Sequence, residues 1–319
     1  MMMYQRVVLP DVTSGMPSGD VIRLESYRDR GTGRSVSMDS YQHQPAFESF
    51  AHPGTRIYER SCDVDGQATI RILHFQPREV TGNMPIVLVP GLSSVIESFR
   101  GLLQEITRSH VVIYVETREK PSSVITVGCG FDMRSIGRDV EAAVSMCCLE
   151  DRGYLLAGYS LGAAAIMEAY GRLSVKPSQV VLAEPVPQFR IPVWSLPLAR
   201  WAPNIFPALK PFAKWYMRNF MIDTRRDPEV MKIVERALDN ADPFKLGQTL
   251  RSVHRYQAWD KLEALDSPTL IVATSSDTLH NHKDITRMKT LISAGTLLDM
   301  KDNQRTHSHE MAVLLRSIS

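Results

Sequence analysis

The segment Gly158-Tyr-Ser-Leu-Gly162 places a serine between two glycines, where an apolar run gives way to small residues at helical spacing. A strand that ends in Gly-x-Ser-x-Gly and turns at once into a helix presents the serine outward, and it needs very small residues two positions before and after. The first N–H groups of such a helix can stabilise an oxyanion beside the serine. Ser160 is therefore a candidate nucleophile, and Gly158 and Gly162 are the candidate elbow glycines.

A serine hydroxyl needs a base, and the base needs a group that orients it. In the arrangement typical of this type of turn, the acid and then the histidine follow the serine along the chain. Asp277 ends the run PTLIVATSSD, and His307 and His309 follow the last apolar run, LLDMK. We predict Asp277 as the acid and His307 as the base, since His309 falls in the terminal helical segment. His309 is the alternative base, and Glu184, at the end of QVVLAEP, is the alternative acid.

The elements that must position these residues have two kinds of pattern. Residues 56–76 alternate apolar and polar side chains on both sides of Asp65-Gly66, which predicts an antiparallel hairpin. After it, short apolar runs that read as buried strands alternate with helical segments. The strands are PIVLVPG, HVVIYVE, YLLAGY, QVVLAEP, PTLIVATS and GTLLDMK, and the helices are residues 95–108, 133–149, the segment after Ser160, and SHEMAVLLRSI. The alternation predicts an α/β fold with a mostly parallel central sheet, opened by the hairpin and covered by helices on both faces.

The chain divides into four predicted segments. Residues 1–53 lack periodicity and are predicted to form a loosely ordered N-terminal arm. Residues 54–185 and 267–319 are predicted to form the two parts of the α/β core. Between them, residues 186–266 form a proline-punctuated helical insertion that is too long for a plain connection and is expected to act as a cap or lid.

Aromatic side chains recur at helical spacing in this insertion, and Lys210, Lys214 and Arg218 interleave with them. The aromatic residues are Phe212, Trp215, Tyr216 and Phe220. Because such stripes are usually buried, the favoured interpretation is that they pack the insertion's own core. The alternative is an apolar underside that receives substrate, or a rim that makes peripheral contact with lipid.

Composition excludes several classes of protein. The 319 residues are 44% hydrophobic and 23% charged, with a net charge of +2 and no basic cluster, so no nucleic-acid partner is expected. The four cysteines form neither a C-x-x-C motif nor a disulfide framework. Neither a signal peptide nor an apolar run of about eighteen residues, as a transmembrane segment needs, is recognisable. A cytoplasmic protein is therefore expected.

From about Arg56 to the C-terminus, these motifs resemble the α/β-hydrolase superfamily, specifically serine hydrolases of the esterase and lipase type with a helical cap. The resemblance implies Ser160 as nucleophile, Asp277 as acid and His307 as base. It also implies that the backbone N–H groups of Leu92, in the turn PGL, and Leu161 form the oxyanion hole.

The chain departs from the family pattern at two places. Pro90 replaces the usual histidine of the first-strand turn. The segment ETREKPSS replaces a glycine-rich loop and brings Glu116, Arg118 and Lys120 near the expected mouth of the site. On the next predicted helix, Asp139 is expected either on a solvated face or as a cap for a neighbouring loop.

The resemblance and the serine imply cleavage of a carboxylic ester with an apolar acyl or alkyl group, through an acyl-enzyme on Ser160. The expected partner is thus a small-molecule ester. A thioesterase, an acyltransferase, a C–C hydrolase and a non-catalytic binding protein on the same fold are the alternatives. This chemistry requires no cofactor and no metal, and His280 and His282 are expected to be solvated loop residues.

Overall fold

The computed structural model separates the chain into two units, Met1–Ser40 and Tyr41–Ser319. The structure describes residues 27–28, 35–36, 42–79, 82–147, 149, 153–191, 196, 208–221, 228–276 and 282–319. In the first unit, β1 (Tyr27–Arg28) pairs with β2 (Ser35–Val36) in an antiparallel arrangement. Most of the arm predicted from the sequence lies outside the described residues.

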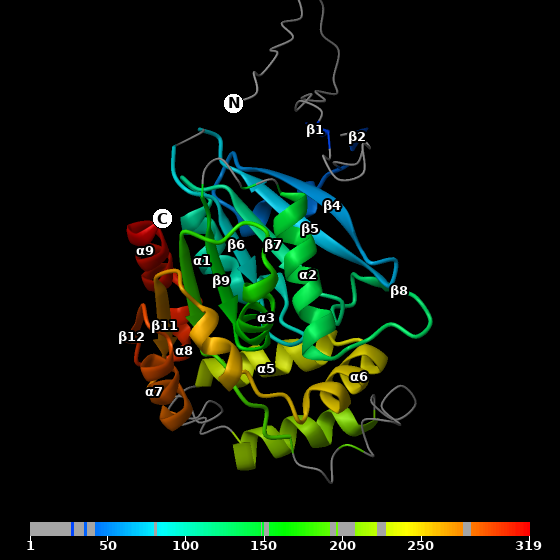
Figure 1. Ribbon diagram of the computed structural model, residues 1–319. Coiled ribbons are helices and arrows are strands. Elements are labelled where there is room, and N and C mark those ends of the chain that lie inside the picture. Colours follow the sequence, from blue (N-terminus) through cyan, green and yellow to red (C-terminus); the bar gives the residue numbers. More distant parts are fainter. Residues whose placement is uncertain are drawn as a thin grey trace, which may run out of the picture. The chain divides into compact units, whose positions relative to one another are not determined.

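The second unit is built on one mixed sheet of ten strands (Figure 1). Its strands are β3 (Gln42–His43), β4 (Arg56–Val64), β5 (Ala68–Gln76), β6 (Ile86–Val89), β7 (Val112–Glu116), β8 (Val124–Ile125), β9 (Leu155–Tyr159), β10 (Gln179–Ala183), β11 (Thr269–Ala273) and β12 (Gly295–Asp299). The order is β12-β11-β10-β9-β6-β7-β5-β4-β3, with β8 beside β5. The pairs among β12, β11, β10, β9, β6 and β7 are parallel, and the remaining pairs are antiparallel. The predicted α/β fold with a mostly parallel sheet is confirmed.

The opening hairpin consists of β4 and β5, which turn at Asp65 and Gly66. Both residues have a positive φ, 54° and 64°, which the twist of a tight hairpin requires. The short strand β3 pairs with β4, and the 3₁₀ helix η2 (Pro45–Phe50) buries Phe50 against the core. Residues 42–50 therefore belong to the main unit, and the division at Ser40 lies earlier than the predicted end of the arm at residue 53.

Helices cover both faces of the sheet because side chains of the buried strands alternate between two apolar clusters. On β6, Val87 and Val89 pack into one cluster, whereas Ile86 and Leu88 pack into the other. The first cluster includes α2 (Met133–Met146), α3 (Leu161–Ala169), η7 (Trp259–Ala264) and α7 (His282–Leu291); the second includes η3 (Ile96–Phe99), α1 (Arg100–Ile106) and α9 (His309–Ile318). The two-sided cover explains why these strands are continuous apolar runs.

The segment between β10 and β11 is largely helical where the structure describes it. It contains a helix over residues 208–216, the π-helical turn η6 (Met217–Met221), α5 (Pro228–Asn240), α6 (Pro243–Val253) and η7. No helix in the described parts of the chain combines the length and the apolar character needed to cross a bilayer.

The aromatic residues of this insertion are not buried as the favoured interpretation predicted. Phe212, Trp215 and Phe220 are 51%, 51% and 65% exposed. The Phe212 ring stacks on Trp215, and the Phe220 ring contacts Trp215 edge-on. Lys214 and Arg218 form ion pairs with Asp239 and Glu235 of α5. Lys214 and Arg218 therefore face α5, whereas the aromatic rings contact one another at the surface.

Candidate active site

Ser160 lies at the junction of β9 and α3, where it precedes the first residue of the helix. Its φ of 48° and ψ of −109° are values that a serine rarely adopts. The Ser160 N–H donates to Ala183 O of the neighbouring strand β10 at 3.0 Å, which fixes the turn against the sheet. The side chain is therefore held at the carboxyl edge of the central strands, where open α/β sheets bind their ligands.

Steric fit explains the two glycines that flank this serine. A Cβ on Gly162 would lie 2.2 Å from Val89 O and 2.7 Å from Pro90 O, both backbone atoms of the segment that leaves β6. A Cβ on Gly158 would lie 2.8 Å from Ala163 N in the new helix. The turn can thus close only when both positions lack a side chain.

Backbone strain gathers at the same edge. Among the described residues, the non-glycine positions with positive φ include Ser93, Ser160 and Glu184, at 50°, 48° and 49°. They follow β6, β9 and β10, three neighbouring strands of the sheet. Since such conformations cost about 1–3 kcal/mol each and concentrate at functional sites, they mark this edge independently of any motif.

His307 follows the short helix α8 (Asn303–Thr306), and its ring packs against aromatic neighbours of the serine turn. Its ring centroid lies 5.0 Å from that of Tyr159, the residue before Ser160, and 4.9 Å from that of Phe99. The Tyr159 hydroxyl donates to Thr306 O at 2.8 Å. Burial raises the pKa of Tyr159 well above its ordinary value, so the phenol keeps the proton it donates. The loop that carries His307 is therefore attached to the strand that carries Ser160.

The contacts of His307 Nδ1 indicate which ring nitrogen carries the proton. Nδ1 lies 3.2 Å from Asn303 O, which can only accept, and 2.9 Å from Thr306 Oγ1. A hydrogen on Nδ1 satisfies these contacts, and in that tautomer Nε2 is the nitrogen that can accept a proton. Thr306 Oγ1 also lies 2.9 Å from Glu184 Oε1, so the buried Glu184 carboxylate is connected to His307 through one hydroxyl.

The alternative base, His309, lies away from the serine turn, and the predicted acid, Asp277, lies outside the described residues. His309 begins α9, its side chain is 64% exposed, and its Nδ1 lies 3.5 Å from Glu105 Oε2 of α1. It has no described contact with the serine turn or with Thr306. Asp277 lies outside the described residues. The preceding residue, Ser276, donates its N–H to Lys301 O in the segment that leads to α8.

The turn after β6 approaches the serine from the other side. A Cβ on Gly91 would lie 3.4 Å from Ser160 Cβ, so the Gly91–Leu92 peptide is adjacent to the proposed nucleophile. Leu161 is the first residue of α3, and its N–H therefore has no acceptor within its own helix. The two backbone N–H groups predicted for an oxyanion hole thus belong to segments that meet at Ser160.

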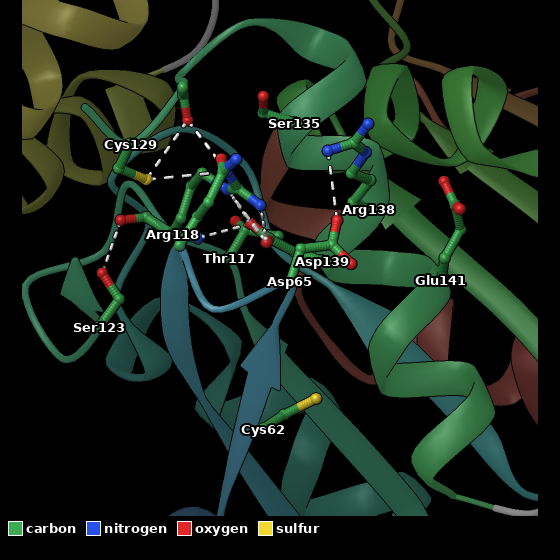
Figure 2. Close-up of polar contacts among 12 residues, drawn as sticks. Cys62, Asp65, Thr117, Arg118, Ser123, Cys129, Ser135, Arg138, Asp139 and Glu141 are labelled. Carbon is green, nitrogen blue, oxygen red and sulfur yellow. Dashed lines mark hydrogen bonds and ion pairs between the residues drawn. The ribbon is translucent and has the colours of Figure 1, made fainter. Parts of the chain in front are cut away.

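The segment after β7 is a buried ionic cluster and not a set of exposed charges. Arg118 is 1% exposed and makes an ion pair of 2.7 Å with Asp139, which is fully buried on α2 (Figure 2). The Asp139 carboxylate also accepts from the Arg118 backbone N–H at 2.8 Å. Glu116 is likewise buried and pairs with Arg71 at 2.8 Å. Of the two interpretations of Asp139, the cap for a neighbouring loop is correct and the solvated face is wrong.

The described residues contain no group of three or more His, Cys, Asp or Glu side chains that could hold a metal ion.

Two residues with contacts around the site, Thr306 and Lys245, were not predicted from the sequence. Thr306 carries no signal beyond its position before His307. Lys245 lies on α6 and donates into the segment after β7, more than a hundred residues earlier in the chain.

A family model described as the alpha/beta hydrolase family matches residues 86–309. The match spans most of the chain, from the first parallel strand to the start of the last helix. The protein therefore belongs to the α/β hydrolase family, as the sequence motifs predicted, and membership supports a hydrolase activity. No curated protein matches the chain in sequence.

Solved structures show the same fold at low identity. A thermophilic esterase from Thermogutta terrifontis is 16% identical, with 82% of this chain and 98% of that chain covered and a TM-score of 0.64. An esterase from Exiguobacterium antarcticum is 13% identical, with coverages of 81% and 97% and a TM-score of 0.66. The enol-lactonase from Burkholderia xenovorans is 15% identical, with coverages of 81% and 96% and a TM-score of 0.63. At these identities the likeness defines the fold, and the reaction must be inferred from the site.

Proposed function

We propose that this protein is a serine hydrolase that cleaves a carboxylic ester with an apolar acyl or alkyl group. The observation that carries the proposal is the strained Ser160 turn, which lies against the Gly91 turn on one side and the Tyr159–His307 contact on the other. A nucleophile, a base and a pair of backbone donors are the parts that acyl transfer through serine needs.

In the proposed reaction, His307 Nε2 takes the hydroxyl proton as Ser160 Oγ attacks the ester carbonyl carbon. The Leu92 and Leu161 N–H groups receive the negative charge that develops on the carbonyl oxygen. The tetrahedral intermediate then expels the alcohol, which takes the proton from His307, and an acyl-enzyme remains. Water attacks it with the help of the same histidine, releases the acid and restores the free serine.

Two carboxylates are candidates for orienting His307. We assign this role to Asp277, because its place after β11 agrees with the order of the family motif. Glu184 is the alternative, and its connection to His307 through Thr306 supports a second, indirect influence on the ring. In either case a negative charge stabilises the imidazolium that forms during attack.

The contacts of the helical insertion support its proposed role as a cap. Its helix α6 reaches the segment after β7, and its helix α5 contacts α8, the short helix before His307. The insertion thus contacts both the segment after β7 and the short helix before His307, and it lies along one end of the sheet (Figure 1). The exposed rings of Phe212, Trp215 and Phe220 support the alternative interpretation, a rim that makes peripheral contact with lipid. A cytoplasmic location, expected from the cysteine pattern, is part of the same proposal.

A panel of p-nitrophenyl esters of increasing acyl length tests the proposal. We expect the protein to hydrolyse at least one ester, and the Ser160→Ala variant to fall to the background rate. Equal rates for the two proteins across the panel would contradict a serine hydrolase and favour the non-catalytic alternative. The same assay, repeated with and without alcohol or thiol acceptors, separates hydrolysis from acyl transfer. Release of p-nitrophenol that is undiminished without an acceptor indicates hydrolysis, and release that requires the acceptor indicates transfer.

A further inference from the structure

Lys120 is a buried lysine that the reaction described above does not use. It is 2% exposed, and its Nζ lies 2.7 Å from Glu119 Oε1, which is also buried. The same Nζ donates a hydrogen bond to Gly91 O, in the turn after β6. A lysine seldom occupies such a position, because removing an ammonium group from water is costly unless it is paired and hydrogen-bonded.

The bond to Gly91 O acts on the neighbouring residue through covalent geometry. Gly91 O and the Leu92 N–H belong to one planar peptide unit and point in opposite directions. A donor that fixes the carbonyl therefore also fixes the direction of the N–H. A charged donor on the oxygen additionally polarises the peptide and strengthens the N–H as a hydrogen-bond donor.

The segment that carries Lys120 is itself anchored at several points. Arg118 is bonded to Asp139 of α2, and its Nη1 donates to Gly130 O at 3.0 Å (Figure 2). From the insertion, Lys245 Nζ donates to Lys120 O at 2.8 Å and to Ser123 O at 2.7 Å. This segment is thus attached both to the core and to α6.

We propose that Lys120 is a positioning residue that orients and polarises the Leu92 N–H of the oxyanion hole, and that Lys245 couples the helical insertion to it. The inference rests on the proposed function, since an oxyanion hole has meaning only if Ser160 attacks a carbonyl. It assigns a role to the segment that replaces the glycine-rich loop. Here a buried side chain stabilises the turn beside the nucleophile, and the segment is held in place from the insertion.

Steady-state kinetics on the best p-nitrophenyl ester test this inference. Because Lys120→Met alone would leave Glu119 buried without its cation, the main variant is Glu119→Gln combined with Lys120→Met. We expect kcat to fall by about 10- to 100-fold with KM changed by less than about threefold, since an oxyanion donor acts mainly in the transition state. Lys245→Met should reduce kcat by a smaller factor, about 3- to 10-fold, because the Gly91 contact remains.

Two further variants separate positioning from folding. Glu119→Gln combined with Lys120→Gln retains a neutral donor and should recover part of the kcat lost in the main variant, whereas a merely structural role predicts that kcat follows the melting temperature. Lys214→Met removes an exposed ion pair with Asp239 in the same insertion and should leave kcat unchanged. If the folded double variant retains its full kcat, the inference is overturned while the proposed function stands. If the wild type is no faster than Ser160→Ala, both are overturned.

Discussion

Ser160 keeps its unusual backbone conformation because a hydrogen bond and close backbone packing on both sides restrict the turn. Its N–H is bonded to Ala183 O, and the segment leaving β6 lies directly against Gly162. Holding a serine at a φ of 48° costs free energy that the surrounding packing must offset. The strain therefore indicates that the turn is maintained because it sets the direction of the Ser160 side chain.

The choice between the two histidines gives the first prediction. His307→Ala should reduce kcat by about 10³-fold or more, because attack by Ser160 then has no base. His309→Ala should change kcat by less than about threefold, since its ring lies in an exposed contact with Glu105. Steady-state kinetics of the two variants provide the measurement, and an inactive His309→Ala beside an active His307→Ala would reverse the assignment.

The two carboxylates give the second prediction. Asp277→Asn should lower kcat by roughly 10³- to 10⁴-fold, the order observed when a triad carboxylate is lost elsewhere. Glu184→Gln should lower it by only about tenfold, because its carboxylate reaches His307 through the Thr306 hydroxyl. A larger loss for Glu184→Gln than for Asp277→Asn would make Glu184 the orienting acid.

Residue types and order were enough to predict the turn at Ser160, its two flanking glycines and the loop that carries His307. They were not enough for Asp139 or Lys245, because each is paired with a residue distant in sequence. A charge on a helix has the same sequence signature whether it faces water or a buried arginine. Only the packing of α2 against the segment after β7 decides between the two.

At the scale of elements, the contact between α3 and the turn after β6 gives the third prediction. Gly162→Ala should lower the free energy of unfolding by about 2 kcal/mol or more, because its Cβ would meet backbone oxygens that cannot move independently. Gly171→Ala is the matched control, since no atom lies within 4 Å of the added Cβ and its φ is not positive. Urea unfolding monitored by circular dichroism measures both, and equal stability of the two variants would refute the close approach.

Helices and strands could be predicted from the sequence where burial produces a recognisable pattern of apolar residues. The buried parallel strands were recognisable as continuous apolar runs, and the β4–β5 hairpin as alternation around Asp65 and Gly66. The run GTLLDMK forms strand β12 as expected, but this strand at the end of the sheet is largely exposed and not buried. The strands β3 and β8 have two residues each, too few to show a period. The aromatic stripe of the insertion was misassigned to a core because helical spacing shows that side chains share a face and not what covers it.

The stability of the whole molecule should depend on pH through His74, on strand β5. Burial, followed by the nearby charge of Arg60, lowers its pKa from 6.5 to about 4. Between these values the unfolded chain binds a proton that the folded chain does not, so stability falls as the pH falls from about 6.5 towards 4.

From pH 7 to pH 5, this group alone should reduce the free energy of unfolding by about 2 kcal/mol. Urea unfolding of the wild type and of His74→Gln at the two pH values measures its share, because the other titrating groups are common to both proteins. The variant should lose less stability than the wild type over this interval. An identical loss in both would show that His74 is protonated equally in the folded and unfolded states.

The central claim is that Ser160 is a nucleophile activated by His307, and covalent labelling tests it most directly. The protein is treated with a fluorophosphonate probe, and intact-mass and peptide mass spectrometry locate the adduct. We predict one adduct per chain, on the peptide that contains Ser160, with a rate that falls steeply in His307→Ala and is retained in His309→Ala. No adduct on the folded wild type, or an adduct that persists in Ser160→Ala, would contradict the account.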